Sequence, residues 1–269
     1  MSNKVILVIL DGLNAKVGID CMGFMQALCE QKRGKSYVLQ CELPSLSRPL
    51  YECILTGIRP IDSGIYHNKI QRLSDEKSIF HYCQQAGKST AAAAYHWISE
   101  LYNHSPFNAA TDRHIADSRL PIQHGHFYYD DTYPDSHLFD DAENLRQNYQ
   151  PDFMLVHPMN IDDMGHKFGV DSMQYRNAAR NADVHLSNYI NIWREDGYQI
   201  IVTADHGMNN DLSHGGTLLE EREVPLYVFG DQFSYNDMTN GINQTELCGT
   251  VCNLLGIEHD EPISRELLI

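Results

Sequence analysis

"YQIIVTADHGMNNDLSHGG", residues 198–216, joins an apolar run to a loop rich in aspartate, histidine and glycine. The run 198–204 predicts a buried strand. Asp205 and His206 follow it directly, and His214 comes eight positions after His206. Taken alone, the segment is either a polar surface loop or a ligand-bearing loop at the end of a strand. The other segments of the chain decide between these two interpretations.

Apolar runs alternate with helix-like periodic stretches along the rest of the chain. Further strands are expected at 4–10, 89–97, 152–158 and 223–230, and helices at 21–32, 50–57, 171–194 and 244–256. This alternation predicts an α/β fold with a doubly wound, mainly parallel central sheet and helices on both faces. Residues 1–269 contain no repeat and no flexible linker, so we expect a single catalytic domain. The aperiodic segment 98–135 is predicted to be a small cap or insertion within it.

Charge and composition restrict the partners. The formal net charge of −16 opposes binding to duplex nucleic acid or to an anionic membrane, but a small phosphorylated substrate is compatible if metal ions supply positive charge. No apolar run approaches the roughly 18 residues of a membrane span. The seven cysteines are scattered through apolar segments and predict buried, reduced thiols. We therefore expect a cytoplasmic protein, either a monomer or a homodimer.

Aspartates and histidines follow three of the predicted strands. They are Asp11 after 4–10, Asp162 and His166 after 152–158, and Asp205, His206 and His214 after 198–204. Because ligands of an open parallel sheet gather outside the carboxyl ends of its strands, we expect these side chains to meet. Carboxylate and imidazole together suit zinc, with manganese or iron as alternatives. Six such ligands predict two ions, which at roughly 3.5–4 Å apart can stabilise both oxygens of a displacement at phosphorus.

The segment "ELPSLSRPLYECILTG", residues 42–57, offers a nucleophile. Ser47 follows a proline-containing loop and precedes a predicted helix. A serine at this position is often only an N-cap. The same position favours a bound phosphoryl group through free backbone amides, and metal coordination would activate the hydroxyl.

Five motifs, in order, resemble one known family. They are "ILVILDGL" (6–13), "LPSLSRPLYECILTGIRPIDSGIYHN" (43–68), "NIDDMGHKFG" (160–169), "TADHGM" (203–208) and "SHGG" (213–216). Together they resemble the alkaline phosphatase superfamily and, within it, the type I phosphodiesterase/nucleotide pyrophosphatase branch. The resemblance implies an alkaline phosphatase-like fold and a two-metal hydrolase of phosphate esters, of the phosphodiester or nucleotide pyrophosphate type.

The resemblance also implies a role for each site residue. One metal would be held by Asp162, His166 and His214, and the other by Asp11, Ser47, Asp205 and His206. Ser47 would attack phosphorus and form a covalent phospho-enzyme, which an activated water would then cleave.

This chain departs from the family pattern beside the nucleophile. The branch usually has asparagine three residues after the nucleophile, where this chain has Leu50, followed by Tyr51 as a predicted substrate contact. Arg48 is the candidate replacement, because a guanidinium matches phosphate oxygens, and it would favour monoesters or phosphonates. The alternative is a solvated arginine.

Two further residues are predicted at the substrate. His96 and Trp97 end the predicted strand 89–97 and so lie at the same edge of the sheet. Trp97 would stack on a base or aryl leaving group, or else pack as a pocket wall.

Other activities of the same superfamily remain alternatives. A phosphomonoesterase or a phosphonate hydrolase keeps the site and changes the substrate. A sulfatase is disfavoured because "SRP" (47–49) lacks that family's later arginine, and a phosphomutase because the cap is small. A catalytically silent metal-binding protein would require a broken ligand set, and all seven positions are intact.

Overall fold

The computed structural model describes residues 3–238 and 241–269. Within these residues, nine strands form one sheet in the order β4-β5-β3-β6-β1-β7-β8-β2-β9. The strands are β1 (Lys4–Ile9), β2 (Lys35–Gln40), β3 (Thr90–Tyr95), β4 (His114–Ala116), β5 (His124–Tyr128), β6 (Phe153–Val156), β7 (Tyr198–Thr203), β8 (Glu223–Phe229) and β9 (Ile242–Asn243).

The centre of the sheet is parallel. β1 pairs in parallel with β6 on one side and β7 on the other, and β3 pairs in parallel with both β6 and β5. Antiparallel pairs lie toward the edges, where β8 joins β7 to β2 and β4 joins β5. Residues 5–9 of β1 are completely buried, as expected for a parallel strand covered on both faces. The predicted doubly wound, mainly parallel sheet is confirmed.

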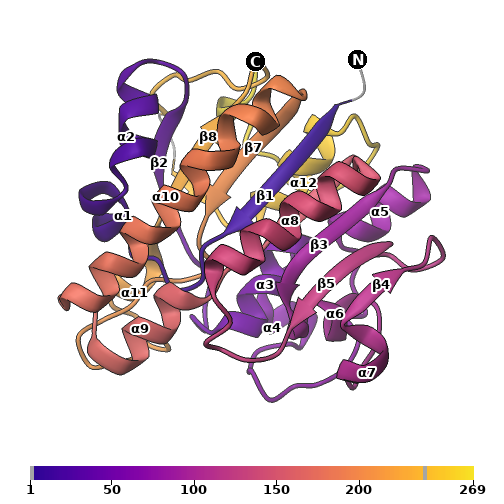
Figure 1. The fold of residues 1–269 in the computed structure, drawn as a ribbon, viewed down its shortest axis with the longest axis horizontal. Coiled ribbons are helices and arrows are strands. Elements are labelled where there is room, and N and C mark those ends of the chain that lie inside the picture. Colours follow the sequence, from indigo (N-terminus) through magenta and orange to yellow (C-terminus); the bar gives the residue numbers. More distant parts are fainter. Residues whose placement is uncertain (1–2, 239–240) are drawn as a thin grey trace.

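Helices cover both faces of the sheet (Figure 1). They are α1 (Ala15–Cys21), α2 (Gly23–Glu30), α3 (Ser47–Thr56), α4 (Pro60–Ser63), α5 (Ile79–Gln85), α6 (His96–Tyr102), α7 (Ala109–Asp112), α8 (Asp135–Tyr149), α9 (Asn160–Phe168), α10 (Met173–Glu195), α11 (Leu219–Arg222) and α12 (Glu246–Leu254). One layer contains α1, α2, α8 and α10, and the other contains α3, α5, α6 and α12. No helix in the described part of the chain combines the length and apolar character needed to cross a lipid bilayer.

The segment 98–135 is more regular than the sequence indicated. Its strand β5 pairs in parallel with β3, and β4 extends the sheet further. The sequence of β5, "HGHFY", alternates partly and fully buried positions over too few residues to stand out among polar neighbours. Part of this segment therefore belongs to the sheet, and a capping role for the remainder stays a prediction.

Other boundaries also differ from the expectation. The predicted strand 89–97 ends at Tyr95, and α6 begins at His96. The strand β2 and the largely polar helix α8 were not predicted, because neither carries a continuous apolar run.

Candidate active site

The predicted ligands follow three adjacent strands. β1 lies between β6 and β7, so the loop after β1, the helix α9 after β6 and the loop after β7 share one edge of the sheet. In Figure 1 this is the lower edge, where β1 ends and α9 and α11 lie. The parallel pairing therefore brings together side chains that are up to about 200 positions apart in sequence.

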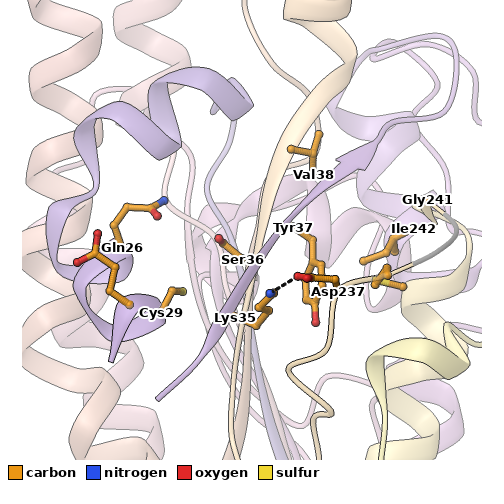
Figure 2. Close-up of a pocket in the computed structure, with 11 residues that line it drawn as sticks. Gln26, Cys29, Lys35, Ser36, Tyr37, Val38, Asp237, Gly241 and Ile242 are labelled. Carbon is orange, nitrogen blue, oxygen red and sulfur yellow. Dashed lines mark hydrogen bonds and ion pairs between the residues drawn. The ribbon is translucent and has the colours of Figure 1, made fainter. Parts of the chain in front are cut away.

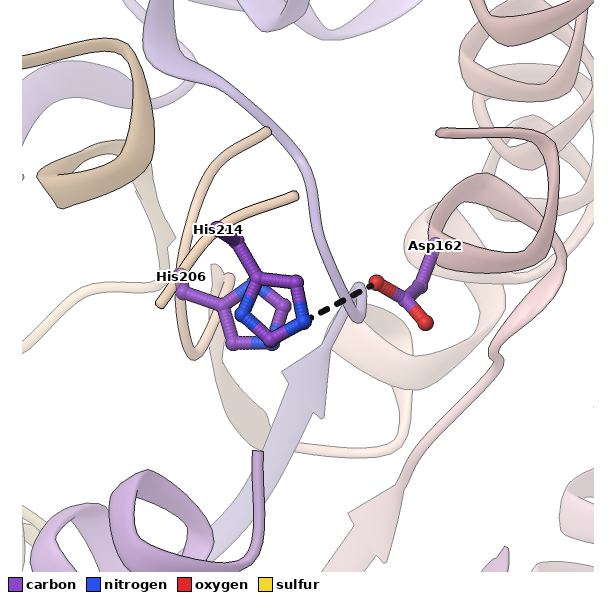
Figure 3. A group of neighbouring side chains, drawn as sticks. All are labelled: Asp162, His206 and His214. Atoms are coloured by element: carbon purple, nitrogen blue, oxygen red, sulfur yellow. Dashed lines mark ion pairs between the residues drawn. The ribbon is translucent and has the colours of Figure 1, made fainter. Parts of the chain in front are cut away.

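Five of the predicted ligands form two adjoining buried groups. Asp11, Asp205 and His206 make one, and Asp162, His206 and His214 make the other; within each, the ligand atoms lie within 4.8 Å of one another. Figure 3 shows the second group, with the two imidazoles stacked and Asp162 facing them from α9. The ring centroids of His206 and His214 are 3.6 Å apart. Because His206 belongs to both groups, the two form one continuous cluster.

Each of the three histidines is oriented by a backbone carbonyl. The Nδ1 atoms lie against such carbonyls, His166 on Leu212 at 2.9 Å, His206 on Gly207 at 2.9 Å and His214 on Ser45 at 2.7 Å. A carbonyl can only accept, so each Nδ1 carries a proton, and in this tautomer the ring's lone pair is on Nε2. This is the arrangement that orients metal-bound histidines.

The first set of Nε2 atoms converges on Asp162. The Nε2 atoms of His166 and His214 are 3.2 Å apart, and they lie 3.5 and 4.0 Å from Asp162 Oδ1. Two lone pairs facing each other beside a carboxylate need a cation between them. The His166 side chain is 45% exposed, so this part of the cluster opens to solvent.

The second set surrounds His206 Nε2. It lies 3.1 Å from Asp205 Oδ2, 3.5 Å from Asp11 Oδ1 and 3.0 Å from Ser47 Oγ. The predicted nucleophile is therefore in direct contact with a predicted ligand.

Three carboxylate oxygens of the cluster lack partners. Within the described residues, Asp11 Oδ1, Asp162 Oδ1 and Asp205 Oδ2 are buried and accept no hydrogen bond. An unpartnered buried acceptor is costly, and a divalent cation supplies what each oxygen lacks. The donor set of carboxylate oxygens and Nε2 lone pairs fits two such cations.

The pKa values of Asp162, Asp205 and His206 also indicate a cation-binding site. Burial raises the pKa of Asp162 and Asp205 well above the ordinary value, and the neighbouring charge of Asp11 raises both further. Burial and the adjacent His214 lower the pKa of His206 to about 3, so its imidazole is neutral. Without cations, the site therefore disfavours ionisation of Asp162 and Asp205, while the neutral His206 can bind a metal.

Ser47 is the first residue of α3 and not its N-cap. Leu46 occupies the N-cap with an extended backbone (φ −124°, ψ 142°), and α3 runs to Thr56, where Gly57 closes it at φ +80°. The Ser47 hydroxyl is therefore not used as a cap and faces His206. The expected set of free backbone amides is not present at the start of α3, because Arg48 N–H donates to Asn68 Oδ1 at 3.1 Å, Pro49 has no N–H and Leu50 N–H donates to the Leu46 carbonyl.

Arg48 is buried and paired. Its side chain is 3% exposed, its Nη2 donates to Glu100 Oε2 at 2.6 Å, and its guanidinium lies 4.5 Å from the centre of the Trp97 ring. The alternative of a solvated arginine is therefore wrong. Because Glu100 neutralises this charge, Arg48 adds no net positive charge beside Ser47.

The other predicted substrate contacts, Tyr51, Trp97 and His96, differ in burial and in the residues that they contact. Tyr51 is completely buried and donates its hydroxyl to Asp11 Oδ2, so its observed contact is with a ligand. Trp97 is half-buried between Arg48 and Tyr95. His96 is also half-buried, and its Nδ1 is 3.9 Å from Glu100 Oε1. Substrate contact by His96 and Trp97 stays a prediction.

Two site residues escaped the sequence analysis. His157 Nε2 lies 3.1 Å from Asp11 Oδ2, with the ring completely buried. It directly follows β6, so the strand-end rule could have found it, but the predicted strand 152–158 included it. Glu100 lies inside α6, where no sequence pattern marks its pairing with Arg48.

A separate cavity lies between α2, β2 and residues 237–238 and 241–242 (Figure 2). Its wall contains an ion pair of Lys35 with Asp237 at 2.5 Å and the thiol of Cys29. Burial raises the pKa of that thiol to about 11, which makes it a poor nucleophile. None of the predicted site residues lines this cavity.

Comparison with known proteins supports the motifs. Residues 5–220 match the family model described as type I phosphodiesterase / nucleotide pyrophosphatase.

Curated relatives include proteins named GPI ethanolamine phosphate transferases. The chain is 20% identical over 272 residues to the human GPI ethanolamine phosphate transferase 2, catalytic subunit, covering 95% of this chain and 26% of the relative. It is 30% identical over 87 residues to GPI ethanolamine phosphate transferase 3 of Saccharomyces cerevisiae, covering 32% of this chain and 8% of the relative. The chain therefore spans at most about a quarter of the length of these relatives.

Solved structures share the fold. Human ectonucleotide pyrophosphatase / phosphodiesterase 5 superposes with a TM-score of 0.75 at 16% identity, over 98% of this chain and 99% of that one. The phosphonate monoester hydrolase of Silicibacter pomeroyi superposes with a TM-score of 0.69 at 14% identity, over 99% and 76%. At these identities the likeness establishes the alkaline phosphatase-like architecture alone.

Proposed function

The chain belongs to the type I phosphodiesterase / nucleotide pyrophosphatase family of the alkaline phosphatase superfamily, and we propose that it is a two-metal phosphoric ester hydrolase with Ser47 as nucleophile. One observation carries the proposal. Ser47 Oγ lies 3.0 Å from His206 Nε2, inside a cluster with three unpartnered buried carboxylate oxygens.

Two divalent cations would occupy the cluster. Asp162, His166 and His214 would hold one, and Asp11, Ser47, Asp205 and His206 would hold the other. Bound there, the cations would lower the pKa of the Ser47 hydroxyl and neutralise charge on the phosphoryl oxygens. Zinc suits this mixture of imidazole and carboxylate, and manganese or iron is also compatible.

The residues of the chain would then orient the substrate and transfer its phosphoryl group first to Ser47 and then to water. Ser47 Oγ forms a bond to phosphorus while the ester oxygen leaves as an alcohol with the serine proton. In the first turn of α3 the N–H of Ser47 is the available donor to a non-bridging oxygen, because Arg48 N–H donates to Asn68 Oδ1 at 3.1 Å and Pro49 has no N–H. Water next adds its hydroxyl to phosphorus and returns a proton to Ser47, which releases the product and restores the serine.

The charge of the site favours a diester or nucleotide pyrophosphate over a monoester. The 2.6 Å pair with Glu100 balances the Arg48 guanidinium, so Arg48 supplies no additional charge for a second negative oxygen. This argument reverses the preference that the sequence alone assigned to Arg48. The proposed substrate is therefore a small phosphodiester.

A second candidate is phosphoryl transfer to an alcohol. The human relative named as a GPI ethanolamine phosphate transferase aligns with 95% of this chain. An alcohol that replaced water in the second step would convert the same serine ester into a transferred phosphoester. Product analysis in the presence of ethanolamine or glycerol distinguishes the two reactions.

We also propose a cytoplasmic location. All seven cysteines are free, and six of them are buried, as is usual for proteins of a reducing compartment.

The test of the proposed function compares three substrates on metal-loaded protein. We expect bis-p-nitrophenyl phosphate to be hydrolysed faster than p-nitrophenyl phosphate, with p-nitrophenyl phenylphosphonate as the phosphonate probe. Ser47→Ala should lose roughly three orders of magnitude in kcat or more while retaining bound metal. Ser264→Ala, which alters another buried serine away from the cluster, is the matched control. Full activity of Ser47→Ala would refute the assignment, and a faster monoester would point to the phosphomonoesterase alternative.

A further inference from the structure

We infer that Tyr51 and His157 are positioning residues that aim one oxygen of Asp11 at the metal centre. The inference rests on the proposed function, because it concerns how a ligand of that centre is held. The Tyr51 hydroxyl and His157 Nε2 both contact Asp11, so both residues act through that carboxylate.

The two oxygens of Asp11 have different surroundings. Oδ2 accepts the Tyr51 hydroxyl hydrogen and also lies 3.1 Å from His157 Nε2. Oδ1 accepts no hydrogen bond from the described residues and lies 3.5 Å from His206 Nε2. The Oδ2 atom is therefore fixed by its two neighbours, whereas Oδ1, which faces the cluster, has no hydrogen-bond donor among the described residues.

The structure fixes which nitrogen of His157 donates. The backbone N–H of Tyr95 donates to His157 Nδ1 at 3.4 Å, so that nitrogen is an acceptor and Nε2 carries the proton. The hydroxyl of Tyr128 donates to the His157 carbonyl at 2.8 Å, and the Tyr51 ring packs edge-on with centroids 4.6 Å apart. A completely buried imidazole held in this way has one orientation available.

Tyr51 links the ligand to the nucleophile. It lies four residues after Ser47 on α3, one helical turn along the same face. Its buried hydroxyl reaches Asp11 while Ser47 reaches His206. The same helix therefore sets the position of the attacking oxygen and of a ligand to the cation that activates it.

Two donors on Oδ2 restrict how Asp11 can bind a cation. With Oδ2 occupied, the carboxylate presents Oδ1 as a single-oxygen ligand in one direction. Without either donor, the carboxylate can turn about its terminal bond or chelate through both oxygens. Loss of such a partner typically weakens metal affinity by about 10–100-fold. We expect that loss at the cation bound by Asp11, Asp205 and His206, and not at the one bound by Asp162 and His214.

The experiment measures zinc binding to metal-stripped protein by competition with a chromogenic chelator. Wild type should bind two ions. Tyr51→Phe and His157→Leu should weaken one ion by about 10–100-fold and leave the other unchanged. His157→Gln should restore most of the affinity, because its amide can donate to Asp11 and accept from Tyr95.

Two control variants make the same chemical change elsewhere. Tyr82→Phe removes a hydroxyl that donates to Glu261 Oε1 at 2.7 Å, and His104→Leu removes an imidazole 3.1 Å from Asp112 Oδ1. Both should bind two ions with wild-type affinity. Asp11→Ala should lose the weakened ion altogether and so identifies it.

The outcomes separate the inference from the proposed function. Unchanged affinities in Tyr51→Phe and His157→Leu, with an ion lost in Asp11→Ala, would overturn the inference and leave the metal centre standing. Equal weakening of both ions would also overturn it, since that indicates general damage. A wild-type protein that binds no zinc would overturn both proposals. If His157→Leu does not fold, Tyr51→Phe carries the test.

Discussion

At the scale of single residues, the pKa values of two buried aspartates are shifted in opposite directions. Burial alone would raise the pKa of Asp11, but the hydrogen bond from His157, electrostatic interaction with His206 and His157, and the hydrogen bond from Tyr51 hold it at about 2. Burial raises the pKa of Asp135 to about 7, because backbone amides are its main compensation. Burial acts on both carboxyls, and they differ in their partners: side chains lower the pKa of Asp11, whereas backbone amides compensate Asp135 only in part.

Asp135 makes the stability of the metal-stripped protein fall with rising pH. The folded state keeps this carboxyl neutral up to about pH 7, whereas the unfolded chain ionises it near its ordinary 3.8. The stabilisation is complete below pH 3.8 and is lost as pH rises through 7, a total of about 4 kcal/mol. Asp135→Asn should remove this loss, measured as free energies of unfolding in urea from pH 4 to 8. The exposed Asp140→Asn is the control, and identical pH slopes for Asp135→Asn and wild type would contradict the assignment.

Glu100 controls the charge beside the nucleophile. Glu100→Gln leaves the buried Arg48 guanidinium without a counter-charge, which should cost about 3 kcal/mol of stability. The freed charge should also raise the ratio of monoester to diester kcat/KM by roughly tenfold, equivalent to about 1.4 kcal/mol.

The matched control for that variant is Glu52→Gln. Glu52 is equally buried and accepts from Ser74 Oγ, with no arginine paired to it in the described hydrogen bonds and ion pairs. A ratio that stays constant in Glu100→Gln would show that Arg48 does not influence the bound phosphate.

At the scale of elements, β6, β1 and β7 carry the site because they are neighbours in the sheet. Their apolar runs made these strands predictable, and the positions of Asp11, Asp162, Asp205 and His206 just after them predicted that these side chains meet. Strands β2, β4, β5 and β9, which lie at or next to the edges of the sheet, were missed, since short strands with polar residues lack that signal. The burial of Arg48 against Glu100 depends on the packing of α3 against α6, which no local pattern encodes.

The loop after β7 depends on a close approach at Gly207. A Cβ at this position would lie 2.0 Å from the Glu220 carbonyl oxygen, which is backbone and cannot move aside. Gly207→Ala should therefore displace the loop that carries His206 and lower stability by roughly 1–3 kcal/mol. Thermal unfolding and the zinc content of the purified variant test this.

Gly23 provides the comparison for the loop variant. A Cβ there meets nothing within 4 Å, so Gly23→Ala should leave both the zinc content and the melting temperature near wild type. Gly207→Ala with two bound ions and an unchanged melting temperature would mean that the loop tolerates the shift.

At the scale of the whole molecule, the negative charge of the protein means that bound cations contribute to its free energy of unfolding. The formal net charge is −16, and three carboxylates converge in one buried cluster. A cation that binds only the folded chain stabilises it by mass action, by about 2.7 kcal/mol when the free ion is 100-fold above its Kd.

Metal removal should therefore lower the melting temperature at neutral pH. The difference in melting temperature between zinc-loaded and chelated protein should shrink as pH falls, because protons compete with the cation for Asp162 and Asp205. Since the pKa values of both carboxyls are raised, this competition begins closer to neutral pH. Calorimetry of both forms at several pH values measures this. Equal melting temperatures at neutral pH would contradict a metal-filled cluster.

The most direct measurement of the central claim is to trap the covalent intermediate. Metal-loaded protein is mixed with bis-p-nitrophenyl phosphate, quenched in acid during turnover and mapped by peptide mass spectrometry. The account predicts a p-nitrophenylphosphoryl adduct, formed with release of one p-nitrophenol, on the peptide that contains Ser47, and neither adduct nor turnover in Ser47→Ala. Undiminished turnover by Ser47→Ala, or an adduct on another residue, would contradict it.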